Sequence, residues 1–210
     1  MYRVLFPLLA LTASTAPAAP RQNPGIVHVR FDTSLGPITL ALDARHAPKT
    51  VANFMAYVDD GRFDDIVFYR SARRTAAPQF GFVQGGIRTD ARRILPAFPL
   101  ETTKMTGIRH TDGTISMARR GDPASAGGNF FITIGAIPSM DARGQFVGYA
   151  AFGHVTRGMA VVKKILARPT GGGMGGQLLL KPVIIKRAVR LDGTPKPTGL
   201  VKPWLQKTHK

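Results

Sequence analysis

Residues 67–86 read VFYRSARRTAAPQFGFVQGG, and this stretch gives the strongest indication of fold and chemistry in the chain. It begins as an aromatic strand and ends as an apolar strand that stops at a Gln-Gly-Gly turn. Arg70 directly follows the first strand, and Gln84 begins the turn. The thirteen residues between them contain Arg73 and Arg74 and are expected to form a loop. The pattern predicts two strands that carry a cation and an amide on either side of a basic loop.

The sequence around this stretch predicts a mainly β domain with two helices. IVHVRF at 26–31 alternates like a half-buried strand, and a turn followed by PITLALD at 37–43 completes a β-hairpin. Helices are expected at 46–61, where Pro48 suits the first turn, and at 157–167. Further short strands are expected at 66–69, 82–84, 114–117, 129–134, 150–155 and 183–191. About eight mostly antiparallel strands favour a closed barrel capped by two helices, although periodicity alone leaves a β-sandwich open.

The first residues are typical of a secretory signal peptide. Arg3 precedes an apolar run at 4–11, and Ala16-Pro17-Ala18 fits a small-residue cleavage site. We therefore expect residues 1–18 to be a signal peptide that is cleaved after Ala18, and the protein to be periplasmic or secreted. The alternative is an uncleaved, disordered N-terminal tail.

Composition separates the remaining chain into three parts. Residues 19–25 are expected to be a linker, residues 26–192 the folded domain, and residues 193–210 a basic C-terminal tail. The tail contains four lysines, no acid and the single tryptophan, Trp204. Tails of this kind are usually disordered, and docking of Trp204 on a partner is the alternative.

Composition also limits the chemistry that the chain can perform. It has no cysteine, which excludes disulfides, thiol catalysis and thiolate metal sites. CxxC, HExxH and Walker patterns do not occur, and the five histidines do not have metal-ligand spacing. No apolar run reaches the 18 residues that would indicate a transmembrane helix. The remaining candidate is chemistry by one cation, one amide and an apolar pocket, with no cofactor and no metal.

The chain is strongly basic. Its formal net charge is +17 at pH 7, and removal of residues 1–18 takes away only Arg3, leaving +16 (17 − 1). Such a charge favours anionic partners, although a solvated basic surface is the simpler interpretation. Because the chain also carries a predicted export signal, we expect no specific nucleic-acid partner.

Four segments together resemble the cyclophilins, the peptidyl-prolyl cis-trans isomerases. They are APKTVANFMAYV, FYR followed by FVQGG, GTISMARRGDPASAGGNFFIT, and MDARGQFVGYAAFGHVTRGMAVV. The resemblance covers roughly residues 26–191. It implies a closed eight-stranded antiparallel β-barrel capped by two α-helices, with a peptide groove and a proline pocket on the outer face of the barrel.

The resemblance also assigns roles to residues. Arg70 matches the catalytic arginine, and Gln84 matches the glutamine that hydrogen-bonds the substrate backbone. Phe131 matches the aromatic floor of the proline pocket, and Phe130 should point into the barrel core because adjacent strand residues alternate. The expected substrate-binding residues are Phe82, Met117, Ala118, Arg119, Asn129, Phe131, Met140 and Tyr149.

The chain departs from the family pattern at four places, one of which is Arg119 and Arg120 in place of small or amide residues. The segment from Ser71 to Gln79 is an insertion in the loop between Arg70 and Gln84, so either Phe80 or Phe82 could fill the first pocket position. Asn129 replaces a glutamine and is one methylene shorter. Ser139 replaces the aromatic residue that contacts cyclosporin in many members, so we expect weak cyclosporin binding.

We therefore expect a monomeric, exported isomerase that acts on proline-containing, unfolded or partly folded polypeptides. Two alternatives remain at this point: a non-catalytic peptide-binding chaperone module that uses the same groove, and an anion-binding scaffold. If the arginines at 73, 74, 119 and 120 lie near the groove, acidic residues flanking the proline should be favoured.

Overall fold

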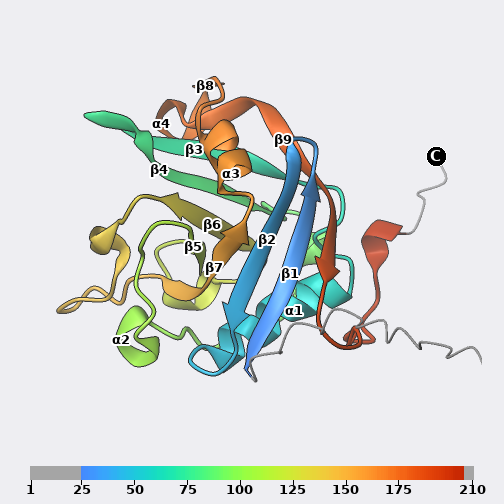
Figure 1. Ribbon diagram of the computed structural model, residues 1–210. Coiled ribbons are helices and arrows are strands. Elements are labelled where there is room, and N and C mark those ends of the chain that lie inside the picture. Colours follow the sequence, from blue (N-terminus) through green and yellow to red (C-terminus); the bar gives the residue numbers. More distant parts are fainter. Residues whose placement is uncertain (1–24, 206–210) are drawn as a thin grey trace, which may run out of the picture.

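The computed structural model describes residues 25–205 and consists mainly of antiparallel strands (Figure 1). The strands are β1 (Ile26–Thr33), β2 (Gly36–Asp43), β3 (Ile66–Arg74), β4 (Ala77–Gly86), β5 (Thr114–Met117), β6 (Asn129–Ile134), β7 (Ala150–Arg157), β8 (Thr170–Gly171) and β9 (Leu178–Arg190). The helices are α1 (Pro48–Asp59), α2 (Thr103–Thr106), α3 (Met159–Leu166) and α4 (Gly173–Gly176). Short 3₁₀ turns are η1 (Ala91–Arg93), η2 (Pro123–Ser125), η3 (Pro138–Met140) and η4 (Pro203–Leu205).

Eight of these strands close into a barrel. Their order is β1-β2-β7-β5-β6-β4-β3-β9, and β9 returns to pair with β1. Every pairing between the strands is antiparallel, and the short β8 only extends the edge beside β9. The closed barrel is therefore confirmed, and the sandwich alternative is wrong.

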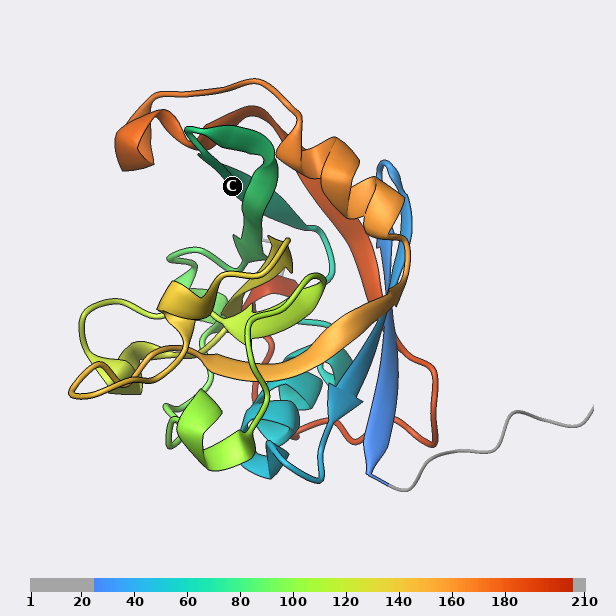
Figure 2. The same cartoon turned by 60° about the vertical axis from the view of Figure 1, so that its left-hand side comes forward.

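Helices α1 and α3 cover opposite ends of the barrel (Figures 1 and 2). Both lie within the ranges that the sequence predicts. The N-terminus of α1 begins at Pro48 and lacks a capping side chain on Ala47. Glu101 supplies the cap from a distant loop, because its carboxylate accepts the backbone N–H of Lys49 at 3.1 Å and of Thr50 at 2.7 Å.

The barrel interior is filled by aromatic rings. Phe130 stacks on Phe31 at 5.3 Å between ring centroids and meets Phe54, Phe63 and Phe68 edge-on at 5.5–5.7 Å. All five side chains have no exposed surface. Phe130 therefore points into the core, as the alternation along β6 predicts.

The insertion from Ser71 to Gln79 is not a loop, and that expectation is wrong. Most of it extends β3 and β4 into a long hairpin that turns at residues 75 and 76. Gly81 permits the close pairing, since its φ is 145° and a Cβ there would lie 2.0 Å from the carbonyl oxygen of Ala72. The hairpin carries its extra length away from the barrel.

The C-terminal tail is folded against the barrel as far as residue 205, so the expectation of a disordered tail is wrong for residues 193–205. Thr198 donates to the Asp60 carboxylate from its backbone nitrogen (2.8 Å) and its hydroxyl (2.6 Å). Arg62, whose side chain is buried, pairs with Asp60 at 2.8 Å, and its guanidinium lies 4.5 Å from the ring centre of Trp204. A buried arginine needs partners, and the tail provides part of them.

Some predictions fall on the termini. The predicted signal peptide at 1–18 and nearly all of the linker at 19–25 lie outside the described residues, as do residues 206–210. Within residues 25–205, no helix has the length and apolar character needed to cross a membrane.

Candidate active site

A groove with a volume of about 660 Å³ runs along the outer face of the barrel, over β3, β4 and β6. It brings together nine of the ten predicted site residues: Arg70, Phe82, Gln84, Ala118, Arg119, Asn129, Phe131, Met140 and Tyr149. These come from three strands and from the loops before and after β6. Residues that are up to 79 positions apart in sequence (Arg70 to Tyr149) therefore form one surface.

Met117 does not line this groove, so its predicted role is wrong. Its side chain is fully buried in the barrel core. In the β5–β6 register, Met117 lies opposite Phe130 and Ser116 lies opposite Phe131. Residues directly opposite each other in a sheet share a face. Since Phe130 faces the core, Met117 faces it as well.

Arg70 is held by two glutamine side chains. Its Nη1 donates to Oε1 of Gln84 at 3.0 Å. Its Nε and Nη2 both donate to Oε1 of Gln177, at 2.9 and 2.7 Å. Among residues 25–205, no carboxylate forms an ion pair with Arg70. The guanidinium is thus oriented by neutral acceptors, and its positive charge is not cancelled.

Gln84 connects Arg70 to the far side of the groove. Its Nε2 donates to the hydroxyl of Tyr69 at 2.7 Å, and that hydroxyl lies 3.4 Å from Oδ1 of Asn129. Asn129 in turn accepts from the backbone nitrogen of Arg88 at 2.8 Å and donates to the Arg88 carbonyl at 3.0 Å. Gln84 and Asn129 therefore belong to one hydrogen-bonded row that fixes the ends of the strands.

The electrostatic environment strengthens the field of Arg70. Partial burial lowers the pKa of its guanidinium, while the nearby Tyr69 and Tyr149 act in the opposite direction. Arginine nevertheless stays charged in proteins. A partly desolvated charge is screened less by water, so it acts more strongly on a group that enters the groove.

Aromatic rings form the apolar part of the groove. Phe131 packs against Phe82 at 5.4 Å and against Tyr149 at 5.5 Å between ring centroids. The guanidinium carbon of Arg70 lies 4.9 Å from the ring centre of Phe82. Phe80 lies elsewhere, beside Gly135 and under Arg74. Phe82 therefore occupies the pocket position that the sequence left open between Phe80 and Phe82.

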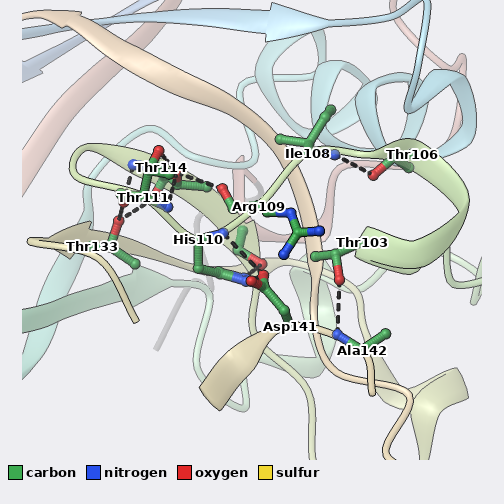
Figure 3. A network of polar contacts seen from close by, with 11 residues as sticks. Thr103, Thr106, Ile108, Arg109, His110, Thr111, Thr114, Thr133, Asp141 and Ala142 are labelled. Carbon is green, nitrogen blue, oxygen red and sulfur yellow. Dashed lines mark hydrogen bonds and ion pairs between the residues drawn. The ribbon is translucent and has the colours of Figure 1, made fainter. Parts of the chain in front are cut away.

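A buried histidine supports the floor of the pocket from behind. The ring of His110 stacks on Phe131 at 5.6 Å with an interplanar angle of 13°. Asp141 fixes this ring, because its Oδ1 lies 2.7 Å from Nδ1 and accepts the His110 backbone N–H at 3.0 Å (Figure 3). Asp141 directly follows Met140, so the same contact also places a residue of the groove wall.

Hydroxyl groups complete this network (Figure 3). Thr103 Oγ1 accepts from the backbone nitrogen of Ala142 at 2.8 Å, next to Asp141. Thr114 donates to the Arg109 carbonyl at 3.0 Å, and its backbone nitrogen donates to Thr133 Oγ1 at 3.0 Å. The loop that carries His110 is therefore fixed on both sides of the histidine.

Ser116, His110 and Asp141 form a hydrogen-bonded chain like that of a hydrolase triad. His110 Nε2 lies 2.9 Å from Ser116 Oγ. A carboxylate can only accept, so Nδ1 carries the proton and Nε2 accepts from the serine. However, Ser116 has no exposed surface and His110 only 1%. Substrate cannot reach Ser116, so this hydrogen-bonded triad has a structural role.

The free energy of unfolding should depend on pH through the protonation of His110. Burial lowers the pKa of His110, and the hydrogen bond to Asp141 opposes this effect only partly. The unfolded chain therefore binds more protons below pH ~6.5, the ordinary histidine value. Stability should be complete above that pH and fall as the pH drops below it. We expect the free energy of unfolding of His110→Asn to be lower than that of the wild type at pH 7.5, and the gap to narrow toward pH 5.

Urea unfolding of both proteins between pH 7.5 and pH 5 measures this effect. His154→Asn is the matched control, because His154 is exposed on β7, and its stability curve should run parallel to that of the wild type. A gap between wild type and His110→Asn that stays constant or widens on acidification contradicts the prediction.

The groove is lined by cations. Its described lining includes four arginines, Arg70, Arg88, Arg119 and Arg120, and no aspartate or glutamate. The Nε of Arg119 donates a hydrogen bond to the Gly148 carbonyl at 2.9 Å. Its guanidinium carbon lies 5.0 Å from the ring centre of Tyr149. Arg88 and Arg120 are exposed.

Arg73 and Arg74 do not line the groove, so the condition for their effect on substrate preference is not met, whereas Arg119 and Arg120 meet it. The Nη2 of Arg73 donates to Thr170 Oγ1 at 3.2 Å, and Arg74 donates to the carbonyl of Ala136. The extension of β3 into the long hairpin carries both residues beyond the groove.

Three contributors to the site were not identified from sequence. Gln177 follows a run of glycines that predicts only a flexible loop, and Arg88 sits in a turn without a motif. His110 has no motif or metal-ligand spacing in the sequence, and only the fold brings its ring against Phe131.

Fold and site together define a class of protein: a closed antiparallel barrel with an external groove that is lined by arginines and aromatic rings. The sequence model of the "Cyclophilin type peptidyl-prolyl cis-trans isomerase/CLD" family matches residues 28–190. The chain therefore belongs to the cyclophilin-type peptidyl-prolyl cis-trans isomerases, and it is an enzyme of that kind.

Relatives and solved structures agree with this membership. The peptidyl-prolyl cis-trans isomerase cyp18 of Streptomyces antibioticus is 35% identical over 164 residues, covering 76% of this chain and 96% of that protein. Peptidyl-prolyl cis-trans isomerase A of Dickeya dadantii is 35% identical over 182 residues, covering 86% and 92%. A cyclophilin-type isomerase of Cryptosporidium parvum shares the fold, with a TM-score of 0.63 at 22% identity over 80% of this chain and 99% of that one.

Proposed function

We propose that this enzyme isomerises X-Pro bonds in unfolded or partly folded polypeptides outside the cytoplasm, and that Arg70 is its catalytic residue. The observation that carries the proposal is the guanidinium of Arg70, held by Gln84 and bordering a pocket whose floor is Phe131. Rotation about an X-Pro bond is slow, with a barrier of about 18–20 kcal/mol, because the amide must lose its resonance. The enzyme must bind the twisted amide more tightly than either planar form.

Each part of the groove has a place in this mechanism. The proline ring sits on Phe131, between Phe82 and Tyr149, where apolar surface is available. Twisting makes the prolyl nitrogen pyramidal and gives it a lone pair. The fixed guanidinium of Arg70 donates toward that lone pair and stabilises the twisted state without having to reorganise. Gln84 fixes Arg70 and offers its remaining amide N–H to the substrate backbone.

This mechanism requires neither a nucleophile nor a metal, and turnover of a short Ala-Pro peptide by the wild-type protein tests it directly. Among the solved structures with the same fold is the Cryptosporidium parvum isomerase studied in the presence of the dipeptide Ala-Pro. A folded wild-type protein that accelerates the cis-to-trans step supports catalysis. A folded protein that only binds the peptide supports instead the chaperone alternative.

The place of action follows from the predicted signal at residues 1–18. The small-residue site at Ala16-Pro17-Ala18 supports export. Expression in a Gram-negative host, followed by N-terminal sequencing of the periplasmic fraction, tests this proposal. A chain that stays in the cytoplasm with residues 1–18 intact contradicts it.

The arginines of the groove predict a preference for acidic residues next to the proline. Arg88 and Arg120 are exposed groove cations, and no carboxylate among the described lining residues offsets them. We expect kcat/KM for a peptide with a flanking glutamate to exceed that for the lysine counterpart about fivefold at low salt. One exposed charge pair contributes about 1 kcal/mol or less, and salt screens it.

Kinetics of the two peptides at low and high salt measure this preference. Arg120→Ala should reduce it, whereas Arg73→Ala, an arginine outside the groove, should leave it unchanged. Equal rates for both peptides at low salt contradict the prediction.

Cyclosporin should bind weakly. Ser139, in η3 beside the groove residue Met140, is small and exposed where an aromatic side chain is expected to contact the drug. Burial of a large aromatic side chain contributes about 1.5–3 kcal/mol. Ser139→Trp should therefore tighten binding at least about tenfold, measured by calorimetry. Tight binding by the wild type, or no gain in the variant, counts against this interpretation.

A further inference from the structure

The glycine-rich segment between β8 and β9 reaches the groove. Residues 171–177 read GGGMGGQ, and Met174 lines the groove with a positive φ of 56°. Gln177 ends this segment, and its carbonyl accepts the backbone N–H of Ser71 at 3.0 Å. The segment is therefore fastened to β3 at the residue next to Arg70. The five glycines before Gln177 leave the rest of the segment with little local stiffness of its own.

The side chain of Gln177 accepts two of the three side-chain hydrogen bonds that Arg70 donates within residues 25–205. Its single Oε1 accepts from both Nε, at 2.9 Å, and Nη2, at 2.7 Å. Oε1 of Gln84 accepts a hydrogen bond from one N–H of Nη1. A guanidinium has five N–H groups, so three are used within the protein and one remains on each terminal nitrogen. The contact on the Nε side fixes the plane of the guanidinium, which a single contact at Nη1 does not.

A neutral acceptor suits this position. A carboxylate there would hold the same edge but would cancel the charge that acts on the substrate. Gln177 orients the cation and leaves its charge available. We propose that Gln177 is a positioning residue that presents the two remaining N–H groups of Arg70 to the twisted X-Pro amide. The inference rests on the catalytic role proposed for Arg70, and it makes the glycine-rich segment part of the catalytic apparatus.

Kinetics separate positioning from binding. In Gln177→Ala we expect kcat for an Ala-Pro peptide to fall about tenfold while KM stays within about twofold of the wild type, since the pocket is intact and only the transition-state contact is lost. Gln79→Ala is the matched control, because Gln79 is exposed on β4 outside the groove, and it should retain the wild-type kcat. Thermal unfolding of each variant verifies that it is folded.

A double-mutant cycle tests whether Gln177 acts through the arginine. An ammonium group has no Nε edge, so in an Arg70→Lys background Gln177→Ala should lower kcat less than twofold. NMR of the Arg70 Nε–H gives a readout without turnover: its hydrogen exchange should be at least about tenfold faster in Gln177→Ala than in the wild type. Equal losses of kcat in both backgrounds, or unchanged Nε–H exchange, overturn the role of Gln177 but leave the proposed function intact. An inactive wild type overturns the proposed function together with it.

Discussion

Replacement of Arg70 by alanine should reduce kcat/KM for a short Ala-Pro peptide by about two orders of magnitude or more. Loss of one preorganised transition-state donor typically costs a factor of about 10²–10³. Arg70 is held by the side-chain amides of Gln84 and Gln177, which leave its charge uncancelled, and it lines the same groove as the pocket-floor residue Phe131. The effect should appear mainly in kcat, because the contact forms fully only with the twisted amide.

Arg70→Lys separates charge from geometry. A lysine keeps the positive charge but lacks the rigid fork that Gln84 and Gln177 orient, so its activity should lie between those of the wild type and Arg70→Ala. Both variants should stay folded, since Arg70 and its partner Gln177 are only half-buried and the buried Gln84 keeps its hydrogen bond to Tyr69. If Arg70→Ala keeps more than about a third of the wild-type rate, Arg70 is not the donor, and the other groove arginines become the candidates.

Local patterns predict most of the strands and the two helices, whereas the closed barrel and the groove residues are what the resemblance to the cyclophilins implies, since periodicity alone leaves a β-sandwich open. The alternation in β6 separates Phe130 from Phe131, and the two ends of the Val67–Gly86 stretch place Arg70 and Gln84 on paired strands, where they face each other in the register. A pattern of period two and a cross-strand pair are both readable from a single chain.

The parts that could not be predicted depend on register and on distant contacts. An irregularity in β3 between Phe68 and Arg70 brings Arg70 opposite Leu178, and so beside Gln177, which is 107 positions away in sequence. The face of Met117 depends on the β5–β6 pairing, which its own short strand does not reveal. The folded tail depends on the burial of Arg62, and the sequence around Gly61-Arg62-Phe63 does not reveal that burial.

Phe130 and Phe131 lie on opposite faces of β6, so their alanine variants test whether one face mainly stabilises the fold and the other mainly binds substrate. Phe130→Ala should lower the free energy of unfolding by about 3–5 kcal/mol, because the ring has no exposed surface and contacts four other aromatic rings of the core. A domain of ordinary stability, about 5–15 kcal/mol, can lose this much and still fold at low temperature. The shift of the urea midpoint measures the loss, provided that the slope of the transition is unchanged.

Phe131→Ala should act on the other face of the same strand. It removes the floor of the proline pocket, and the lost apolar contact of about 1.5–3 kcal/mol corresponds to a fall in kcat/KM of about one to two orders of magnitude. Because Phe131 packs on His110 and outside the central aromatic cluster, its loss should destabilise the fold less than Phe130→Ala does. The folded fraction of Phe130→Ala should keep its turnover within about threefold. If both variants lost activity in proportion to stability, the groove face and the core face of β6 would not be energetically separate, and the assignment of Phe131 to substrate binding would fail.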